Sequence, residues 1–599
     1  MKPLFESIVL PSTPIPVEQS AARELQDALR RVTGETLPIL PETAGVKGRA
    51  FFVGDTQATR SAAVEALPGS AGFQPAADER ELVPPVTAGG WRDDEILIRE
   101  TDGGLVLTGH PQRGPLYAVC TYLEDFVGVR WWTSSASYYP SRPLADLPVA
   151  NLRFAPRLKY REAYYLDGFD PLLKVRSKIN YSSAARYEPA TPVHPFIPPE
   201  LGGNYRLYFF EGRRSAYHSF FEVLPPSQHF DAHPEWYSLV DGKRVAHQLC
   251  LSNDEMAEAY IAETLRRLRE MPEANFIQVS QNDWQGACEC DACRAIEAEE
   301  GGAHSGIYLR FANRVAEAIE KEFPHVMVDT FAYQFTRAAP SRTRPRHNVV
   351  VRLCDIECAF NRPLTDFEQN RAFLKDLADW SRIAPGQIFI WDYLADFKSY
   401  MLPHPNLLSI APNIRTFADA GAVGVFEQGD ACCAAGEFAP LRFWLVAHLL
   451  WNPDADERAL IEEFVRGYYG PSAAPHILAY IELVNGAGAA SDKPMRCYHA
   501  NVTDWLSENV RDDAVREMAA AMAAAEGDGP EYARRVRREQ LSTDHMRLLN
   551  WRPEDGDRDA FARRWVADCR AFGVCAAAET TDPGQFEAYA AELQGIQGD

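Results

Sequence analysis

The feature that most constrains the fold is an alternation, from residue 157 onward, of short apolar runs with longer segments of helical periodicity. Strands that alternate with helices in this way form a parallel sheet, and eight such units fit a closed (β/α)8 TIM-type barrel. The clearest helical segments span 254–269, 306–323, 367–382 and 406–420. The eight predicted strands are 158–166, 178–181, 247–251, 276–280, 326–331, 349–353, 388–391 and 423–426.

The pattern changes at both ends of this barrel region, so the sequence predicts three domains. Residues 1–152 are predicted to form a small α/β domain, and the run Asp102-Gly103-Gly104 between two apolar stretches is typical of a hairpin. Residues 153–470 form the catalytic barrel, in which the segment 181–246 is an elaborated loop over the barrel mouth. Residues 471–599 form a C-terminal helical domain.

Charge and hydropathy exclude several classes of partner. The chain has 84 acidic against 61 basic residues and a net charge of −23, so nucleic acid and anionic membranes are poor partners. No apolar run reaches the roughly 18 residues of a membrane span. The first residues do not resemble a signal peptide, so the sequence as written predicts a cytoplasmic protein, or an exported one if a leader was removed. It makes no prediction of oligomeric state.

The chemistry of a barrel lies at the C-terminal ends of its strands, and here carboxylates alternate with Trp and Tyr at those positions. Paired carboxylates supply the acid and the base or nucleophile of glycosidic-bond cleavage. The sequence has no phosphate-binding Gly-rich loop after a strand, no Gly-x-Ser-x-Gly elbow and no His-Glu-x-x-His run. The pattern therefore indicates sugar hydrolysis, with an oligosaccharide or glycoconjugate as substrate and no cofactor.

The roles follow from position. Glu357 is the first choice for the general acid, Asp283 is the alternative acid, and Glu427 is the second carboxylate. Each has a structural alternative: Asp283 as a helix cap, Glu357 as an ion-pair partner of Arg352 or Arg362, and Glu427 as a buried strand residue. The candidate substrate-binding residues are Tyr165, His218, Asn282, Trp284, Tyr333, Asp355, Trp391, Asp392 and Tyr393.

Three cysteines have the spacing of metal ligands. Cys288, Cys290 and Cys293 form a Cys-x-Cys-x-x-Cys run, which is a possible structural zinc site if a fourth ligand exists. Cysteines near predicted strand ends are candidates for that ligand, and the alternative is three reduced thiols that pack beside the pocket. These further candidates are Cys354, Cys358, Cys432 and Cys433.

Taken together, these motifs resemble a known family. Residues 22–39 and 114–132 resemble the small α/β domain that precedes the barrel in α-glucuronidases and β-hexosaminidases. The barrel resembles the region named "domain of unknown function 4838". The motifs that carry this resemblance are His233-Pro234-Glu235, Ser280-Gln281-Asn282-Asp283 with the cysteine triplet, Ala332-Tyr333, Cys354-Asp355-Ile356-Glu357-Cys358, Trp391-Asp392-Tyr393, Gly424 to Gly429 and Tyr468-Tyr469-Gly470.

The resemblance implies a glycoside hydrolase similar to the family 163 endo-β-N-acetylglucosaminidases. It implies a retaining, substrate-assisted mechanism, in which the 2-acetamido oxygen is the nucleophile and two carboxylates assist. Two alternatives remain. One is a uronic-acid hydrolase of α-glucuronidase type, with Arg161, Arg213 and Arg352 as candidates for a basic subsite. The other is a non-catalytic sugar-binding protein on a barrel scaffold.

Overall fold

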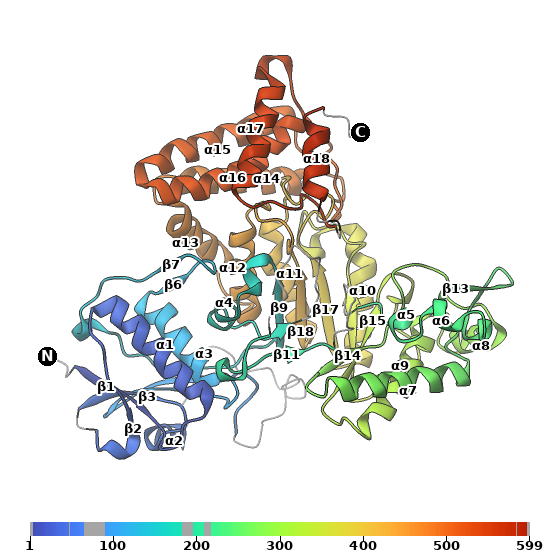
Figure 1. Cartoon of the computed structure of the whole chain (residues 1–599), viewed down its shortest axis with the longest axis horizontal. Coiled ribbons are helices and arrows are strands. Elements are labelled where there is room, and N and C mark those ends of the chain that lie inside the picture. Colours follow the sequence, from blue (N-terminus) through green and yellow to red (C-terminus); the bar gives the residue numbers. More distant parts are fainter. Residues whose placement is uncertain are drawn as a thin grey trace.

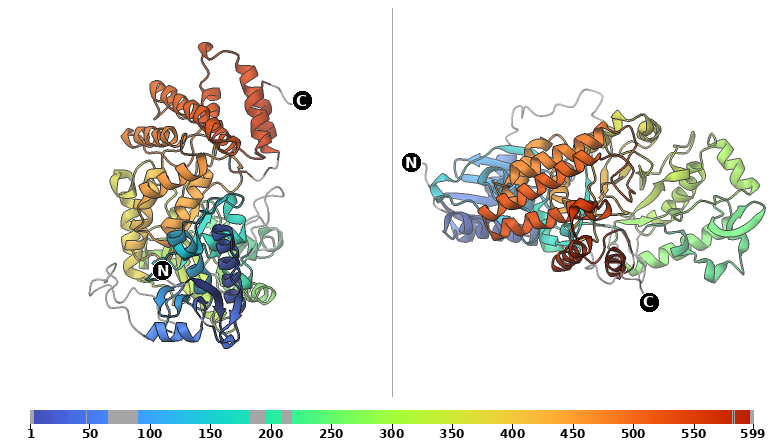
Figure 2. Two further views of the ribbon diagram at one scale, coloured as in Figure 1. Left: turned by 90° about the vertical axis from the view of Figure 1, so that its left-hand side faces the viewer. Right: turned by 90° about the horizontal axis from the view of Figure 1, so that it is seen from above.

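The computed structural model describes residues 4–46, 48–64, 90–182, 196–208, 217–580, 582 and 584–595. A parallel sheet stands at the centre, and three parts surround it (Figure 1, Figure 2). The N-terminal sheet lies on one side, the α7–α9 region on the other, and the C-terminal helices lie at one end (Figure 1). This arrangement confirms a mixed α/β fold with a helical C-terminal region, whereas the exact domain boundaries stay a prediction.

The central sheet has six strands, all parallel, in the order β14-β15-β16-β17-β18-β9. Rings from its two edges meet, with the Tyr160 and Phe276 centroids 5.0 Å apart. Because β9 and β14 are the edge strands, this contact means that the sheet curls back on itself. The strands are β9 (Tyr160–Tyr164), β14 (Phe276–Gln278), β15 (Met327–Ala332), β16 (Val349–Cys354), β17 (Ile388–Tyr393) and β18 (Gly424–Gln428).

Two short strands, β10 (Tyr181–Ser182) and β11 (Tyr205–Arg206), pair in parallel with each other. On one side the Asn180 amide donates to the Arg161 carbonyl of β9, at 3.2 Å. On the other side the Tyr208 amide donates to the Phe276 carbonyl of β14, at 2.7 Å. These two strands therefore lie between the edges of the curled sheet. The strand predicted at 178–181 shares only Tyr181 with β10.

The predicted third strand at 247–251 is wrong as a barrel strand. Residues of this run belong to β13 (Lys243–Leu249), which forms an antiparallel hairpin with β12 (Tyr237–Val240) outside the central sheet. The turn between them is Asp241-Gly242, and both residues have positive φ angles, 49° and 74°. Two successive positive φ angles define the type I′ turn that joins two-residue hairpins, so Asp241-Gly242 was the sequence signal for this hairpin.

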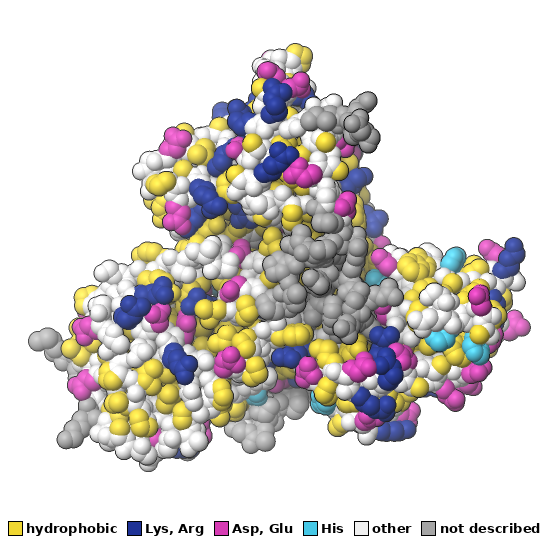
Figure 3. Space-filling model, viewed as in Figure 1, with side chains coloured by type: hydrophobic (Ala, Val, Ile, Leu, Met, Phe, Trp, Pro, Cys, Tyr) yellow, Lys and Arg dark blue, Asp and Glu magenta, His cyan; other side chains and the backbone are white. Residues whose placement is uncertain are grey.

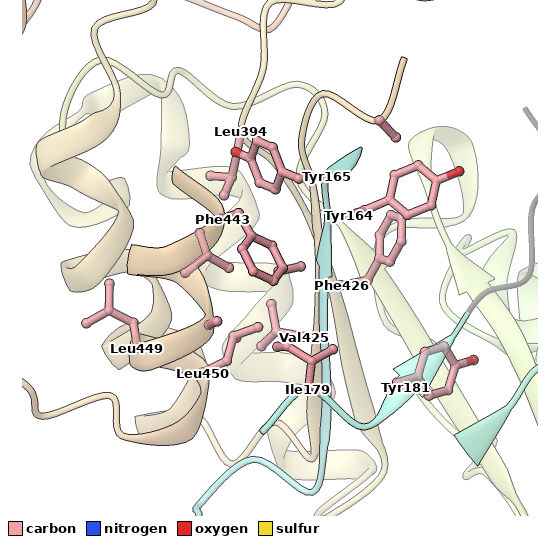
Figure 4. Close-up of a cluster of buried hydrophobic side chains, with 14 of the residues drawn as sticks. Tyr164, Tyr165, Ile179, Tyr181, Leu394, Val425, Phe426, Phe443, Leu449 and Leu450 are labelled. Carbon is pink, nitrogen blue, oxygen red and sulfur yellow. The ribbon is translucent and has the colours of Figure 1, made fainter. Parts of the chain in front are cut away.

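Side chains of the central strands alternate between two faces. The inner face carries aromatic rings from several strands, and Phe426 of β18 contacts Trp391 of β17 with centroids 4.6 Å apart. Val425, the neighbouring residue, lies on the opposite side with Phe443 of α12 (Figure 4). Figure 4 shows the same split at the end of β9. Tyr164 is the last residue of the strand, Tyr165 follows it, and their side chains lie on opposite sides of the sheet. This alternation decides which strand-end residues point into the curl.

Helices cover the outer face and build the C-terminal end. No membrane-spanning candidate is found among the described helices. On the face drawn in Figure 3, acidic and basic side chains are interspersed over the described residues. The helices around the sheet are α4 (Pro171–Arg176), α5 (Phe220–Val223), α6 (Pro226–His229), α7 (Asp254–Glu270), α8 (Asp291–Glu299), α9 (Ser305–Glu320), α10 (Arg371–Ile383), α11 (Ile410–Asp419) and α12 (Ala439–Trp451). The C-terminal helices are α13 (Glu457–Tyr469), α14 (Ala474–Ala490), α15 (Glu508–Asp528), α16 (Pro530–Leu549), α17 (Arg558–Ala571) and α18 (Gln585–Leu593).

The N-terminal part is a six-stranded mixed sheet in the order β2-β1-β3-β5-β4-β8. Its last strand, β8, contains residues on both sides of the predicted domain boundary at 152. A separate short hairpin, β6 (Arg130–Trp131) with β7 (Ser137–Tyr138), follows its helices. The elements are β1 (Phe5–Leu10), α1 (Pro16–Thr33), β2 (Ile39–Pro41), β3 (Arg49–Val53), α2 (Gln57–Val64), β4 (Ile96–Thr101), β5 (Gly104–Gly109), α3 (Gly114–Thr121) and β8 (Leu152–Phe154).

A buried charge network joins this N-terminal sheet to the first strand of the central sheet. Asp94 accepts from Arg113 at 2.6 Å and from Arg161 of β9 at 2.7 Å, and all three side chains are buried. Asn180 donates a further hydrogen bond to the same carboxylate at 2.7 Å. Burial raises the pKa of Asp94, but the charges of Arg113 and Arg161 outweigh it and lower the pKa to about 2.

This network predicts a large stability loss in Asp94→Ala. The substitution leaves two buried guanidinium groups without their carboxylate, and breaking a buried pair costs about 3–5 kcal/mol. Denaturant unfolding measures the loss. The control is Asp27→Ala, which removes an exposed partner of Arg30 and is expected to cost less than about 1 kcal/mol. Equal losses in the two variants would contradict the coupling.

Candidate active site

Asp283, in the loop after β14, lies at the C-terminal end of the sheet beside two aromatic groups. Tyr333, which follows β15, donates from its hydroxyl to the Asp283 carboxylate at 3.0 Å. The His218 Nε2 atom is 3.8 Å from the same carboxylate, while its Nδ1 atom lies 2.9 Å from the Gln281 carbonyl oxygen. Burial lowers the pKa of His218, and Asp283 opposes this shift.

Two residues beside Asp283 have strained backbones. His218 has a φ angle of 58° and Gln334 one of 51°, in the left-handed region that residues other than glycine rarely adopt. Gln334 donates to the Tyr333 hydroxyl at 2.8 Å, so it completes a chain of hydrogen bonds that ends on Asp283. Strain of this kind persists where the surrounding structure enforces it, and it clusters at functional sites.

A second carboxyl group, Glu579, reaches the same end of the sheet. Trp391 of β17 donates to Gln428 of β18 at 2.8 Å, and Gln428 donates to the Glu579 carboxylate at 3.2 Å. Burial is the main cause that raises the pKa of Glu579 to about 7, and the charge of Asp283 adds to it. Glu579 and Asp283 thus form an interacting pair of carboxyl groups with different environments.

Glu579 was not among the sequence-predicted residues. It comes from the C-terminal region, whose chain returns to the loop after β17: the Glu579 amide donates to the Phe397 carbonyl at 2.8 Å, and the Phe397 amide donates to the Cys497 carbonyl at 2.9 Å. The neighbouring Tyr498 is close enough for Glu579 and Asp283 to contribute to the raised pKa of its hydroxyl. No local pattern around Glu579 signals this return, because the residue follows no strand.

Hydrogen bonds from hairpin strand β13 hold the loop that carries Asp283. The Gln248 side chain donates to the carbonyls of Asn282 and Trp284, at 3.1 and 2.6 Å, and Asn282 donates to the His247 carbonyl at 2.9 Å. The amide of Asn282, predicted to bind substrate, is therefore used to shape the loop. Trp284 remains 47% exposed. Its ring borders an open hollow of about 600 Å³ lined by Val240, Ala246, His247, Trp284, Gln285 and Gly286.

Glu427, the predicted second carboxylate, lies on the other face of its strand. It neighbours Phe426 and Gln428, whose side chains point into the curl, so the strand alternation directs Glu427 outward. There it interacts with Asp392 and Asp355, and all three are fully buried. Burial, followed by repulsion between the groups, raises the pKa of Glu427 and of Asp355 well above the ordinary values, and burial raises that of Asp392 to about 6.

The remaining predicted residues divide between the site and its surroundings. Glu357 forms an ion pair with Arg337 at 2.8 Å, and Arg337 also binds Asp376. Glu357 is therefore held in an ion pair with Arg337. Tyr165 is buried on the α12 side of β9 (Figure 4). Tyr393 is stacked with Trp391, with centroids 6.1 Å apart, and both belong to the inner face.

The structure therefore does not gather Asp283, Glu357 and Glu427 into one hollow, as the sequence had suggested. It brings together Asp283, Tyr333, His218, Trp391 and Tyr393, and it adds Gln428 and Glu579. Among the described residues, the clusters with metal-ligand geometry are Cys250 with Cys288, Cys290 and Cys293, and His233 with Glu235 and Glu255, so neither includes Asp283 or Glu579.

The fold and site define a parallel α/β protein whose carboxyl and aromatic side chains converge at the C-terminal ends of its strands. The family model described as "Domain of unknown function (DUF4838)" matches residues 131–482. The chain belongs to this family, which confirms that part of the sequence resemblance. Among curated proteins no significant match is found.

Several solved structures are similar in overall chain path. A GH138 enzyme targeting pectin rhamnogalacturonan II matches with a TM-score of 0.43 and 10% identity, over 98% of this chain and 74% of that one. The protein named CpGH84D matches with a TM-score of 0.47 and 10% identity, over 99% and 96%. A family 89 glycoside hydrolase from Clostridium perfringens, in complex with PUGNAc, matches with a TM-score of 0.47 and 10% identity, over 83% and 66%. At this identity and these TM-scores, the likeness assigns neither an activity nor a substrate to this chain.

The buried acidic cluster predicts a pH-dependent stability that Glu427→Gln reduces. A carboxyl whose pKa is raised by folding stabilises the fold below its ordinary pKa, and this stability is lost as the pH rises through the raised value. Gln keeps the shape and carries no charge. Because the pKa of Glu427 is raised well above its ordinary value, we expect the wild type to lose more stability than the variant as the pH rises above the ordinary carboxyl range.

Thermal and denaturant unfolding at several pH values measure this difference. The control is Asp419→Asn, which changes an exposed partner of Arg157 and should follow the wild-type pH dependence. Parallel curves for Glu427→Gln and the wild type would contradict a neutral, buried Glu427.

Proposed function

We propose that this protein is a glycoside hydrolase that cleaves β-linked N-acetylhexosamine, on a (β/α)8-type barrel that β10 and β11 close. The observation that carries the proposal is the pair formed by Glu579 and Asp283 at the C-terminal ends of the strands. The pKa of Glu579 is raised to about 7, while Asp283 is held by a hydrogen bond from Tyr333. Two carboxyl groups in contrasting environments are what acid and base roles require.

The surroundings of the pair suit a sugar better than other substrates. Trp391 and Tyr393 offer stacked rings on the inner face, and Trp284 offers an exposed ring on the other side of Asp283. Aromatic faces pack against the apolar face of a sugar ring, while Gln428 and His218 supply hydrogen-bonding groups for its hydroxyls. This combination supports a carbohydrate site that extends beyond a single sugar unit.

In the proposed mechanism Glu579 is the general acid. Because its pKa is raised to about 7, a large share of Glu579 carries a proton at neutral pH. That proton passes to the glycosidic oxygen as the bond to the leaving group breaks. The Asp283 carboxylate stabilises positive charge that develops on the sugar, or on its 2-acetamido group when that group attacks the anomeric carbon. Tyr333 positions Asp283. The retaining, substrate-assisted course is what the family resemblance implies, and Glu579 and Asp283 are the two carboxyl groups that would assist it.

The uronic-acid alternative needs a basic subsite, and two of its three arginines have other partners. Arg161 is bound to Asp94, and Arg352 forms a fully buried pair with Asp329 below the site. Arg213 lies outside the described residues. A neutral acetamido sugar therefore fits the described groups better than a carboxylated one.

The assignment of Glu579 predicts a loss of activity in Glu579→Gln. Removal of a general acid lowers the rate by about 10²- to 10⁴-fold, and the loss should be smaller for an aryl N-acetylglucosaminide whose phenol leaves without a proton. Because the acid form of Glu579 disappears as the pH rises through about 7, wild-type kcat/KM should fall there, and the variant should lack this decline. Steady-state kinetics with two leaving groups across pH measures both effects.

The matched control is Glu357→Gln, for which we expect activity near that of the wild type, since Glu357 is paired with Arg337. If Glu357→Gln loses activity and Glu579→Gln keeps it, the acid is Glu357 and the proposal for Glu579 is wrong. Sugar binding without turnover in the wild type would favour the non-catalytic alternative. Hydrolysis of aryl glucuronide in preference to aryl N-acetylglucosaminide would favour the uronic-acid enzyme.

The exposed ring of Trp284 predicts that its removal raises KM more for long substrates than for short ones. Because its ring is exposed at the hollow beside Asp283, Trp284→Ala removes stacking from a sugar at a distance from the cleaved bond. We expect KM for an oligosaccharide to rise about 5- to 10-fold, which corresponds to roughly 1–1.4 kcal/mol, with little change for an aryl monosaccharide. Equal effects on both substrates would contradict a separate outer subsite.

A further inference from the structure

Four cysteine thiols meet at one point beside the loop that carries Asp283. Cys250 follows hairpin strand β13, Cys288 and Cys290 follow the Asp283 loop, and Cys293 lies in the first turn of α8. Their Sγ atoms all lie within 4.8 Å of one another. Cys250 and Cys293 are buried, whereas Cys288 and Cys290 are partly exposed. Two chain segments about 40 residues apart in the sequence therefore bring four sulfur atoms together.

The spacing of these sulfur atoms matches a tetrahedral metal site. In a tetrahedron with the usual Zn–S distance of about 2.3 Å, neighbouring sulfur atoms are about 3.8 Å apart. The Cys250 Sγ atom lies 3.7 Å from that of Cys290 and 3.9 Å from that of Cys293. A disulfide would bring two sulfur atoms to about 2.05 Å. The observed distances thus fit four ligands around one ion rather than two bonded pairs.

The surroundings of the sulfur atoms favour thiolates. The Leu239 amide donates to Cys288 Sγ at 3.3 Å, and the Arg244 guanidinium approaches the same sulfur at 3.8 Å. The Ser252 hydroxyl lies 3.1 Å from Cys293 Sγ. Cys290 is the residue that precedes α8, so it and Cys293 sit at the positive end of that helix. Donors and positive charge of this kind orient metal-bound thiolates and stabilise their negative charge.

We propose that Cys250, Cys288, Cys290 and Cys293 bind one Zn²⁺ ion as a structural tetrathiolate site. Binding forms four Zn–S bonds, and the protons of the four thiols pass to solvent. Since protein sulfur fills all four positions, no position remains for water or substrate, which is the arrangement of a structural rather than a catalytic zinc site. The fourth ligand is Cys250 and none of the four cysteines that the sequence had suggested.

The position of the site suits a structural role, because its ligands come from both the β13 hairpin and the Asp283 loop. Gln248, two residues before Cys250, holds the carbonyls of Asn282 and Trp284, and Cys288 ends the same loop. A metal bound to both segments would fix hairpin strand β13 against the loop and hold Asp283 in place. The ion would therefore position the loop without touching substrate.

Elemental analysis of the purified full-length protein tests the proposal without reference to activity. We expect one zinc ion per chain in the wild type and in Cys575→Ser, which changes a partly exposed thiol outside the cluster. Cys293→Ser should lose the zinc. Absence of metal together with two disulfides, found by mass spectrometry of the unreduced protein, would overturn the proposal. Stoichiometric iron in place of zinc would overturn the assignment of the ion.

A second measurement covers the case in which Cys293→Ser fails to fold. Wild-type protein treated with a thiol-reactive reagent and a zinc-binding dye should release one zinc per chain as four thiols react. Reconstitution with Co²⁺ should give the visible absorption of a tetrahedral cobalt thiolate. Release of zinc without reaction of these four cysteines, mapped by peptide mass spectrometry, would place the ion elsewhere. These outcomes are independent of any effect on glycoside hydrolysis.

Discussion

The ladder of parallel strands from β9 through β18 to β14 is the interaction on which the rest of the structure depends. Because the strands run in one direction, their hydrogen bonds bring every strand end to the same edge of the sheet. Because side chains alternate, only every second residue near that edge points into the curl. Trp391 and Gln428 satisfy both conditions, whereas Asp392 and Glu427, one residue away, do not. A residue therefore belongs to the candidate site only if it lies near the C-terminal end of its strand and its side chain points to the inner face.

The buried carboxyl groups differ in the partners that surround them. Where the fold needs rigidity, buried carboxylates are matched to guanidinium groups, as with Asp94 between Arg113 and Arg161 and with Asp329 beside Arg352. Glu579 is different, since a neutral amide, Gln428, is its hydrogen-bond partner and the charge of Asp283 raises its pKa. Burial and the charge of Asp283 raise the pKa of this carboxyl to about 7, and a general acid is most effective when its pKa lies near the working pH.

Sequence reasoning located much of the sheet and part of the site. The runs at 326–331, 349–353 and 388–391 lie within strands β15, β16 and β17 or overlap them closely, because buried parallel strands are short apolar segments between helices. The run at 247–251 was misassigned, since the turn at Asp241-Gly242 directs it into a hairpin. Asp283 and Tyr333 were found from their positions after strands. Glu357, the residue predicted to be the acid, forms an ion pair with Arg337. The two residues are 20 positions apart, and no local pattern in the sequence predicts their contact.

The sequence by itself determined the parallel α/β plan, the family, the strand ends that carry Asp283, Tyr333 and Trp391, and three of the four clustered thiols. These are local properties, because periodicity, composition and short spacings can be recognised in the sequence without knowledge of the fold. Only the tertiary structure decided that Cys250 joins the thiols, that Glu427 turns outward and that Glu579 reaches the site. Each of these depends on where distant segments meet after folding, and a contact between distant segments is set by the packing of the whole chain rather than by the residues beside it.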